Sequence, residues 1–184
     1  MIKNFIISTA GHIDHGKTAL VKALTNIDCD THKQEKERGI TISLGFAKIV
    51  YPNDIYVSVV DVPGHKDFID TMISGVSSLN LAIVVISADS GIMPQTIEHI
   101  KILDALGVKK GIIALTKTDL VEPIIIELAE EEIKQHIKDT FLKDAPICKV
   151  SSYTKEGIDG LKFAILNELQ KPHISEFYQS KHSF

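Results

Sequence analysis

Residues 11–18 read GHIDHGKT, and no other stretch of the sequence constrains the fold as strongly. It lies between an apolar run at residues 5–9 and a helical segment, and its spacing is that of a GxxxxGK[ST] phosphate-binding loop. In such a loop the glycines let backbone amides turn inward around phosphates, while the lysine neutralises the β and γ oxygens and the hydroxyl binds Mg²⁺. The phosphate-binding residues expected here are Asp14, His15, Gly16, Lys17 and Thr18, with Thr18 also a metal ligand.

Short apolar, β-branched runs recur along the chain and predict six strands. Segments between most of them repeat apolar residues every three or four positions, as in residues 68–76 and 126–137, and predict helices. Alternating strands and helices predict an α/β fold of the P-loop NTPase type: a mostly parallel six-stranded sheet with helices on both faces and ligands at the carboxyl ends of the strands. The second and third strands, joined by a turn at residues 52–54, are expected to be antiparallel. The predicted strands are residues 5–9, 42–50, 55–60, 81–86, 111–115 and 147–150.

Helix starts and domain limits can also be predicted. Pro94 and Pro123 are typical of first helical turns, and Gly157 precedes the last helical pattern. The 184 residues are long enough for one domain, at residues 1–171, and residues 172–184 are expected to be a tail or the stub of a linker.

Composition excludes several classes of protein. A net charge of −4 argues against binding nucleic acid over the whole surface, because that function needs a basic face. Cys29 and Cys148 are too far apart in sequence to suggest a metal pair and too few for a disulfide framework, which fits a reducing cytosol. No apolar run approaches the roughly 20 residues that span a bilayer. We therefore expect a soluble, cytoplasmic protein with no membrane partner.

Three segments that follow later strands indicate which nucleotide is bound. In DVPGH, residues 61–65, Asp61 can bind Mg²⁺ through water, the Gly64 amide can reach a γ-phosphate, and His65 faces the attacking water. In TKTD, residues 116–119, the aspartate can accept two hydrogen bonds from guanine, whereas adenine lacks that pair of donors. The two serines that follow the sixth strand can close over the guanine O6. The predicted guanine-binding residues are Thr116, Lys117, Asp119, Ser151 and Ser152.

A charged segment before the second strand is interpreted as a nucleotide-dependent switch. It ends in RGIT, residues 38–41, where Thr41 can complete the Mg²⁺ coordination only while a γ-phosphate is present. His12 and His15 suggest a zinc site at first sight. Zinc is set aside because it needs four ligands and no further Cys or His clusters nearby.

These segments together resemble the translational GTPase superfamily, from about Phe5 to about Lys171. GHIDHGKT, RGITI and DVPGH are similar to the phosphate-loop and switch sequences of that superfamily, and GIMPQTIEHI is similar to its third helix. Within it, the resemblance is to the selenocysteine-specific elongation factors, because position 116 is threonine instead of asparagine and DVPGH is followed by Phe68 and Ile69.

The resemblance implies roles for individual residues. His65 would orient or activate the water, Ile13 and Ile40 would form an apolar gate around it, and Asp14 would contact a monovalent cation. The asparagine that the family carries at position 116 helps hold the guanine loop, residues 116–119, to the phosphate loop. Its replacement by Thr116 leaves open how firmly the base is held.

The resemblance further implies a Mg²⁺-dependent GTPase that converts GTP to GDP slowly without the ribosome. Ribosome and aminoacyl-tRNA, here selenocysteyl-tRNA, would be partners only of the intact factor, because the tRNA- and mRNA-binding domains of the family are missing from this sequence. Three alternatives stay open. They are the domain of an elongation factor Tu relative or of an initiation factor gamma subunit, a nucleotide-gated binding module with negligible hydrolysis, and an ATP-using P-loop kinase, which Asp119 disfavours.

Overall fold

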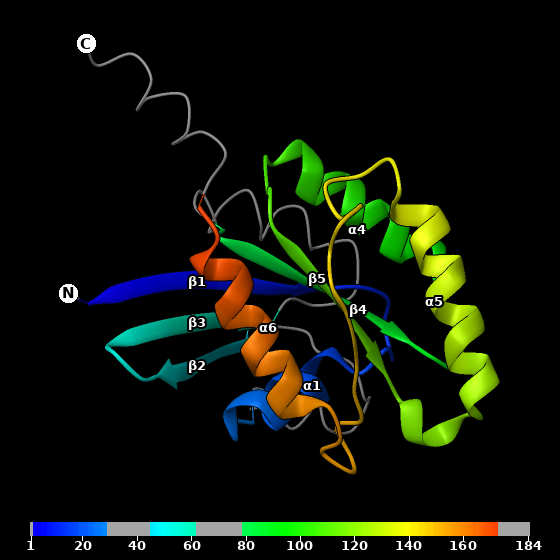
Figure 1. Ribbon diagram of the computed structural model, residues 1–184, viewed down its shortest axis with the longest axis horizontal. Helices are drawn as coiled ribbons and strands as arrows, with labels where there is room; N and C mark the ends of the chain where they lie inside the picture. The colour runs from blue at the N-terminus through cyan, green and yellow to red at the C-terminus, as the bar shows by residue number, and fades with distance from the viewer. Residues whose placement is uncertain (1, 29–44, 62–78, 173–184) are drawn as a thin grey trace.

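The computed structural model describes residues 2–28, 45–61 and 79–172, and it contains a six-stranded sheet in the order β2-β3-β1-β4-β5-β6 (Figure 1). Every neighbouring pair is parallel except β2 and β3, so both the strand count and the single antiparallel pair are confirmed. The strands are β1 (Lys3–Ala10), β2 (Gly45–Tyr51), β3 (Ile55–Asp61), β4 (Leu81–Ser87), β5 (Gly111–Thr116) and β6 (Ile147–Lys149).

Some predicted strand limits are wrong by one or two residues. β1 begins at Lys3, ahead of the apolar run, because Lys3 is paired with Ile55 of β3. β6 ends at Lys149, one residue before the predicted limit. Residues 42–44 of the predicted second strand, the predicted helix at 68–76 and the tail from residue 173 lie outside the described residues.

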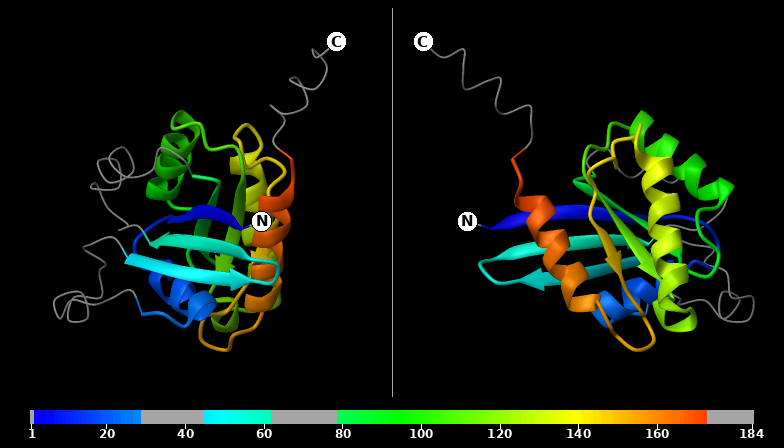
Figure 2. Two further views of the ribbon diagram at one scale, coloured as in Figure 1. Left: turned by 90° about the vertical axis from the view of Figure 1, so that its left-hand side faces the viewer. Right: turned by 45° about the vertical axis from the view of Figure 1, so that its right-hand side comes forward.

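Helices cover both faces of the sheet, as predicted (Figures 1 and 2). Helices α1 and α6 pack on one face through a core cluster that includes Leu20 and Leu161, and α4 and α5 pack on the other through a cluster that includes Leu103 and Ile133. β4 is buried along its whole length because its side chains enter the two clusters alternately. The helices are α1 (Lys17–Thr25), α4 (Pro94–Ala105), α5 (Pro123–Ile137) and α6 (Ile158–Gln170), with a 3₁₀ turn η1 (Thr118–Leu120).

The predicted helix starts are confirmed. Pro94 and Pro123 are the first residues of α4 and α5, where proline loses no hydrogen bond. Gly157 caps α6 with φ 74°, and a Cβ there would lie 2.0 Å from the Lys149 carbonyl oxygen. Only glycine fits this close approach without moving the backbone.

The sheet brings three loops together at one end. Ala10 at the end of β1 is paired with Val84 of β4, and Ser87 at the end of β4 is paired with Thr116 of β5. The phosphate loop, the β4–α4 connection and the guanine loop therefore leave neighbouring strands on the same side, where open α/β sheets bind ligands.

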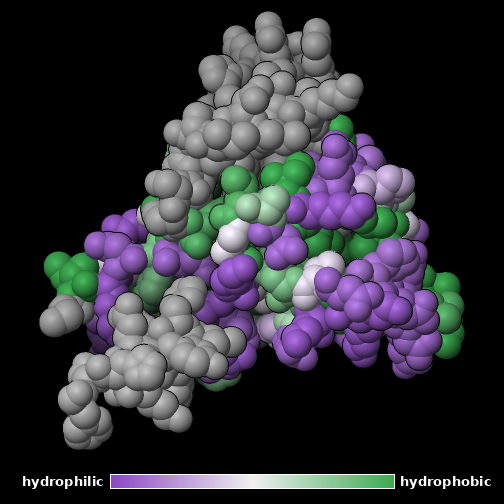
Figure 3. Space-filling view, turned by 90° about the horizontal axis from the view of Figure 1, so that it is seen from above, coloured by the Kyte–Doolittle hydropathy of each residue, from purple (hydrophilic) through white to green (hydrophobic). Residues whose placement is uncertain are grey.

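Where Figure 3 is coloured by hydropathy, hydrophilic and hydrophobic areas lie side by side. Exposed apolar side chains include Phe46 on β2 and Ile124 on α5. In the described parts of the chain, each helix is too short or too polar to cross a membrane.

Candidate nucleotide-binding site

The phosphate loop turns sharply between β1 and α1. Gly11 has φ 135° and Gly16, which precedes α1, has φ 85°. A Cβ on Gly11 would lie 2.3 Å from the carbonyl oxygen of Val85 in β4, so the loop runs directly over that strand. Helix α1 begins directly after Gly16, and the amides of its first turn, which have no partner within the helix, are available to bind phosphate.

Lys17 lies across the loop with only 7% of its surface exposed. Its ammonium donates hydrogen bonds to the carbonyl oxygens of Gly11, at 3.1 Å, and of His12, at 2.8 Å. Burial lowers the pKa of Lys17 to about 8, against the opposing charges of Asp61 and Asp14. The ammonium is therefore held inside the cradle where phosphate oxygens would lie.

Oxygen donors for a magnesium ion border the loop. Asp61 is fully buried at the end of β3, where its Oδ1 accepts a hydrogen bond of 2.7 Å from the Thr9 hydroxyl. Thr18, the second residue of α1, is half-buried. A carboxylate and a hydroxyl beside a phosphate site suit Mg²⁺, which takes few protein ligands and completes its shell with phosphate oxygens and water. Residues 2–28, 45–61 and 79–172 contain no cluster of three His, Cys, Asp or Glu side chains that could hold a metal by themselves.

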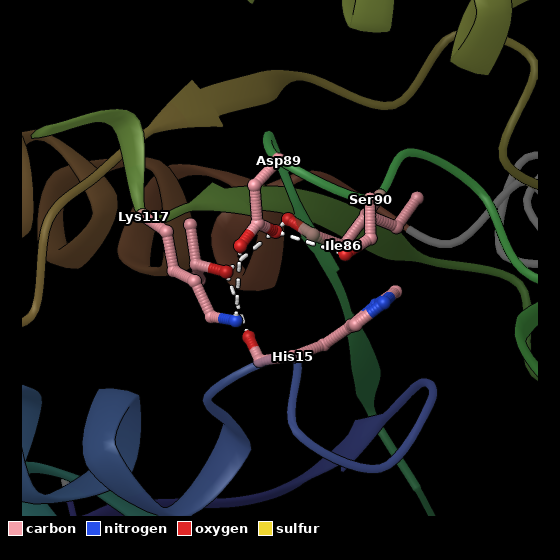
Figure 4. Close-up of polar contacts among 6 residues, drawn as sticks. His15, Ile86, Asp89, Ser90 and Lys117 are labelled. Atoms are coloured by element: carbon pink, nitrogen blue, oxygen red, sulfur yellow. Dashed lines mark hydrogen bonds and ion pairs between the residues drawn. The ribbon is translucent and has the colours of Figure 1, made fainter. Parts of the chain in front are cut away.

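Thr116 ties the guanine loop to the phosphate loop. Its hydroxyl donates a 2.7 Å hydrogen bond to the carbonyl oxygen of His15, with the Ile86 carbonyl oxygen further away at 3.3 Å (Figure 4). Thr116 is almost fully buried, so the bond is shielded from water. The sequence left open how the two loops are held without asparagine, and the threonine hydroxyl makes this connection.

A Thr116→Val variant is expected to lose about 1–3 kcal/mol of unfolding free energy, because the buried His15 carbonyl would lose its partner. GDP should also dissociate faster, since the two halves of the site would no longer be tied. Urea unfolding and stopped-flow GDP release measure the two effects. Thr118→Val, the same change two residues further on, serves as the control. Equal stability and release rates for wild type and Thr116→Val would contradict a role for this hydrogen bond.

Helix α4 holds the other side of the phosphate loop through two residues that the sequence analysis missed. The Gly11 N–H donates to His99 Nδ1 at 3.1 Å, and the Ile13 N–H donates to Gln95 Oε1 at 3.2 Å. Because Nδ1 accepts, the His99 imidazole is neutral and carries its proton on Nε2. Both residues lie in GIMPQTIEHI, which resembles the third helix of the family but was given no role, and their i, i+4 spacing behind Pro94 places them on one helix face.

Burial keeps two histidines near the loop neutral. It lowers the pKa of His99 to about 4, helped by the charges of Lys17 and His12, and it lowers the pKa of His15 to about 4, helped by His12. Both side chains are almost fully buried, with 3% and 2% of their surface exposed. Protonation would remove the acceptor on which the Gly11 amide depends.

Stability is therefore expected to fall between pH 6.5 and pH 4. Above pH 6.5 both histidines are neutral in the folded and unfolded chain, and below it the unfolded chain takes up protons that the folded chain does not. Each histidine should remove up to about 3 kcal/mol of unfolding free energy across this window. Urea unfolding at several pH values measures this slope.

His99→Gln should make the slope of stability against pH shallower, because an amide oxygen can replace Nδ1 as acceptor without titrating. His136→Gln, on the exposed side of α5, is the control. A slope unchanged by His99→Gln would contradict the interpretation.

A cavity of about 680 Å³ opens beside the phosphate loop. Four of the five predicted guanine-binding residues line it, and Asp119 lies on η1. The fifth, Ser151, is fully buried and shapes the loop: its hydroxyl accepts the Thr154 N–H at 3.0 Å. Tyr153, which the sequence analysis did not single out, is 89% exposed at the rim. The lining residues are Gly16, Ala19, Lys22, Thr116, Lys117, Asp119, Leu120, Ser152, Tyr153 and Lys155.

Comparison with known protein families decides between nucleotide-binding classes. The family described as "Elongation factor Tu GTP binding domain" matches residues 2–171. The chain belongs to this elongation factor Tu GTP-binding domain family. It is a translational GTPase domain, which agrees with the interpretation of the motifs.

Individual relatives of this GTP-binding domain are parts of longer proteins. A selenocysteine-specific elongation factor of Desulfomicrobium baculatum is 49% identical over 157 residues, which are 85% of this chain and 25% of that protein. The translation initiation factor 2 gamma subunit of Thermococcus onnurineus is 38% identical over 188 residues, covering 90% of this chain and 46% of that subunit. A crystal structure of a bacterial selenocysteine-specific elongation factor superimposes with a TM-score of 0.87 at 42% identity, covering 94% of this chain and 30% of that one. The chain thus spans less than half the length of these relatives.

Several predicted site residues of the GTP-binding domain lie outside the described residues. They are Ile40, Thr41, Gly64 and His65. Ile13, the described residue of the predicted apolar gate, is half-buried, and its N–H donates a hydrogen bond to Gln95. Asp14, predicted to contact a monovalent cation, is exposed and has a φ of 64°.

Proposed function

We propose that this chain binds GTP and GDP with Mg²⁺ and hydrolyses GTP as the GTP-binding domain of a cytoplasmic selenocysteine-specific elongation factor. The observation that carries the proposal is the hydrogen bond between Thr116 and the His15 carbonyl. This bond holds the phosphate loop beside the cavity that Asp119 lines, and Gly16 of the phosphate loop lines the same cavity.

In this proposal each described residue has one task. Lys17 and the amides of the first α1 turn bind the β- and γ-phosphates, and Asp119 accepts hydrogen bonds from the guanine N1 and N2 groups. Thr18 and Asp61, together with Thr41 from outside the described residues, would hold Mg²⁺, which would neutralise charge that develops on the phosphates. The Asp14 oxygens are available to a monovalent cation.

His65 orients the attacking water, and Ile13 and Ile40 keep that water from reacting until the ribosome acts. Turnover of the isolated domain should be slow: GTPases of the Ras type hydrolyse GTP at roughly 10⁻⁴ to 10⁻³ per second and gain about 10⁵-fold from an activator. Selenocysteyl-tRNA and the ribosome would be partners of the intact factor.

Calorimetry of the purified chain with GDP, GTP and ATP in Mg²⁺ buffer tests the binding half of the proposal. We expect GDP and GTP to bind and ATP to bind at least 10⁴-fold more weakly, because adenine leaves Asp119 unpaired. Equal binding of ATP and GTP would contradict it and favour a P-loop kinase. Single-turnover phosphate release tests the hydrolytic half. Release that is unchanged by His65→Ala would favour a nucleotide-gated module.

The initiation factor gamma subunit is the second candidate, because the 38% identity to the Thermococcus subunit extends over 90% of this chain. Experiments on the full-length protein distinguish the selenocysteine-specific factor from the initiation factor gamma subunit. Filter binding of the full-length factor to selenocysteyl-tRNA, in preference to initiator tRNA, is expected for the selenocysteine factor. The opposite preference would favour the gamma subunit. The chain by itself is expected to bind neither tRNA tightly.

A further inference from the structure

We propose that Asp89 is a positioning residue for the guanine nucleotide: its carboxylate holds the Lys117 ammonium so that the lysine stem forms a wall of the base cavity. The inference rests on the proposed nucleotide-binding function and concerns a residue outside all the recognised motifs.

The backbone sets Asp89 beside Lys117 through the pairing of two parallel strands. Ser87 is paired with Thr116, and the Ala88 N–H extends this pairing by donating to the Thr116 carbonyl oxygen at 2.8 Å. The chain then turns, with the Gly91 N–H donating to the Ser87 carbonyl oxygen at 2.9 Å. This turn points the carboxylate of Asp89 toward the guanine loop (Figure 4).

Two contacts occupy the two oxygens of this carboxylate. Oδ1 accepts a hydrogen bond from the Ser90 hydroxyl at 3.0 Å, and Oδ2 pairs with the Lys117 ammonium at 3.4 Å. Lys117 lines the cavity, and the side chains of Asp89 and Lys117 are 34% and 31% exposed, so salt can reach the pair. Burial acts to raise the pKa of Asp89, but nearby hydroxyls and the Lys117 charge outweigh it and hold the pKa below its ordinary value. The carboxylate is therefore charged at neutral pH.

Only the side chain of Lys117 is left to be positioned, because its backbone is already fixed. Lys117 adopts a left-handed φ of 57°. Both neighbouring residues make hydrogen bonds: the Thr116 hydroxyl donates to the His15 carbonyl oxygen, and the Thr118 N–H donates to the Val150 carbonyl oxygen at 3.5 Å. A lysine side chain has four rotatable bonds and loses freedom when a base packs along it. Asp89 restricts that freedom before the nucleotide arrives, which is how preorganisation raises affinity.

A double-mutant cycle on GDP affinity tests this role, with Asp89→Asn, Lys117→Met and the double variant measured by calorimetry at 50 mM NaCl. Lys117→Met keeps an apolar stem and removes the charge. We expect Asp89→Asn to weaken GDP binding about two- to five-fold, as for a partly exposed ion pair, and to have no further effect in the Lys117→Met background. At 1 M NaCl the effect of Asp89→Asn should nearly disappear, because salt screens the pair.

Two control variants test whether a loss of GDP affinity in Asp89→Asn comes from a change in net charge or in the turn that carries Asp89. Asp54→Asn removes one negative charge at the exposed β2–β3 turn and should leave GDP affinity unchanged. Ser90→Ala removes the other hydrogen bond of the Asp89 carboxylate and keeps its charge, so it reports on the turn alone and should change affinity by less than two-fold.

The inference is overturned if Asp89→Asn weakens GDP binding equally with and without the Lys117 ammonium, or equally at both salt concentrations, because the turn and not the ion pair would then be responsible. It is also overturned if wild type and Asp89→Asn bind GDP alike. Failure of the proposed function looks different: the folded wild-type chain would itself bind no GDP.

Discussion

Replacing Asp119 with asparagine is expected to weaken GDP binding by about 10⁴-fold and to create tight binding of xanthosine diphosphate. Asp119 lies on η1 and lines the cavity beside the phosphate loop. Its carboxylate can only accept hydrogen bonds, which matches the N1 and N2 donors of guanine, whereas the asparagine amide can donate to the second carbonyl of xanthine. Calorimetry with the two nucleoside diphosphates measures both effects.

Asp104→Asn, on the exposed side of α4, is the matched control for Asp119→Asn and should bind GDP like the wild type. Full GDP affinity in Asp119→Asn would mean that another group recognises the base. Loss of GDP binding without any gain for xanthosine diphosphate would mean that the substitution deformed η1 instead of changing selectivity.

A Gly11→Ala variant is expected to be at least about 3 kcal/mol less stable than the wild type and to lose nucleotide binding. Its Cβ would lie 2.3 Å from a backbone oxygen of Val85, in the fully buried strand β4, and the φ of 135° is strained for any residue with a Cβ. The loop would have to lift from the sheet, and the Gly11 N–H would leave His99. Urea unfolding and GDP titration measure the two losses.

Gly160→Ala on α6 makes the same chemical change where a Cβ would have no neighbour within 4 Å. Because Gly160 is exposed and helical, this control should stabilise the chain by about 0.5–1 kcal/mol. A Gly11→Ala protein as stable as the wild type would show that the phosphate loop does not need to lie against β4.

Much of the fold could be predicted because local chemistry and global arrangement agree. The all-apolar run of β4 is typical of a strand buried on both faces, and the helix-starting prolines of α4 and α5 act within one turn of the chain. The strand limits were less predictable, since Lys3 is in β1 only because Ile55 pairs with it from the neighbouring strand. Edge positions of this kind depend on tertiary pairing and not on the residue itself.

The site was predictable where a motif carries its own chemistry, and unpredictable where distant segments meet. Lys17 and Asp119 belong to short motifs with a fixed spacing. The contact of His99 with Gly11 spans 88 residues, and that of Thr116 with the His15 carbonyl spans 101. Such contacts depend on how α4 and the end of β5 lie against the phosphate loop, which the sequence pattern around each residue does not encode.

A small cavity of about 290 Å³ lies at the end of the sheet away from the nucleotide loops. Its lining indicates that the chain could be circularly permuted. Lys3 and Pro172, near the two limits of the described chain, line this same cavity. A short peptide could join them, and new ends could be opened at Gly107, where a Cβ would touch nothing within 4 Å. We expect such a circular permutant to keep the strand order of the sheet, because neither the new peptide nor the new ends interrupt a strand. The order in which the strands are synthesised would then not determine the fold.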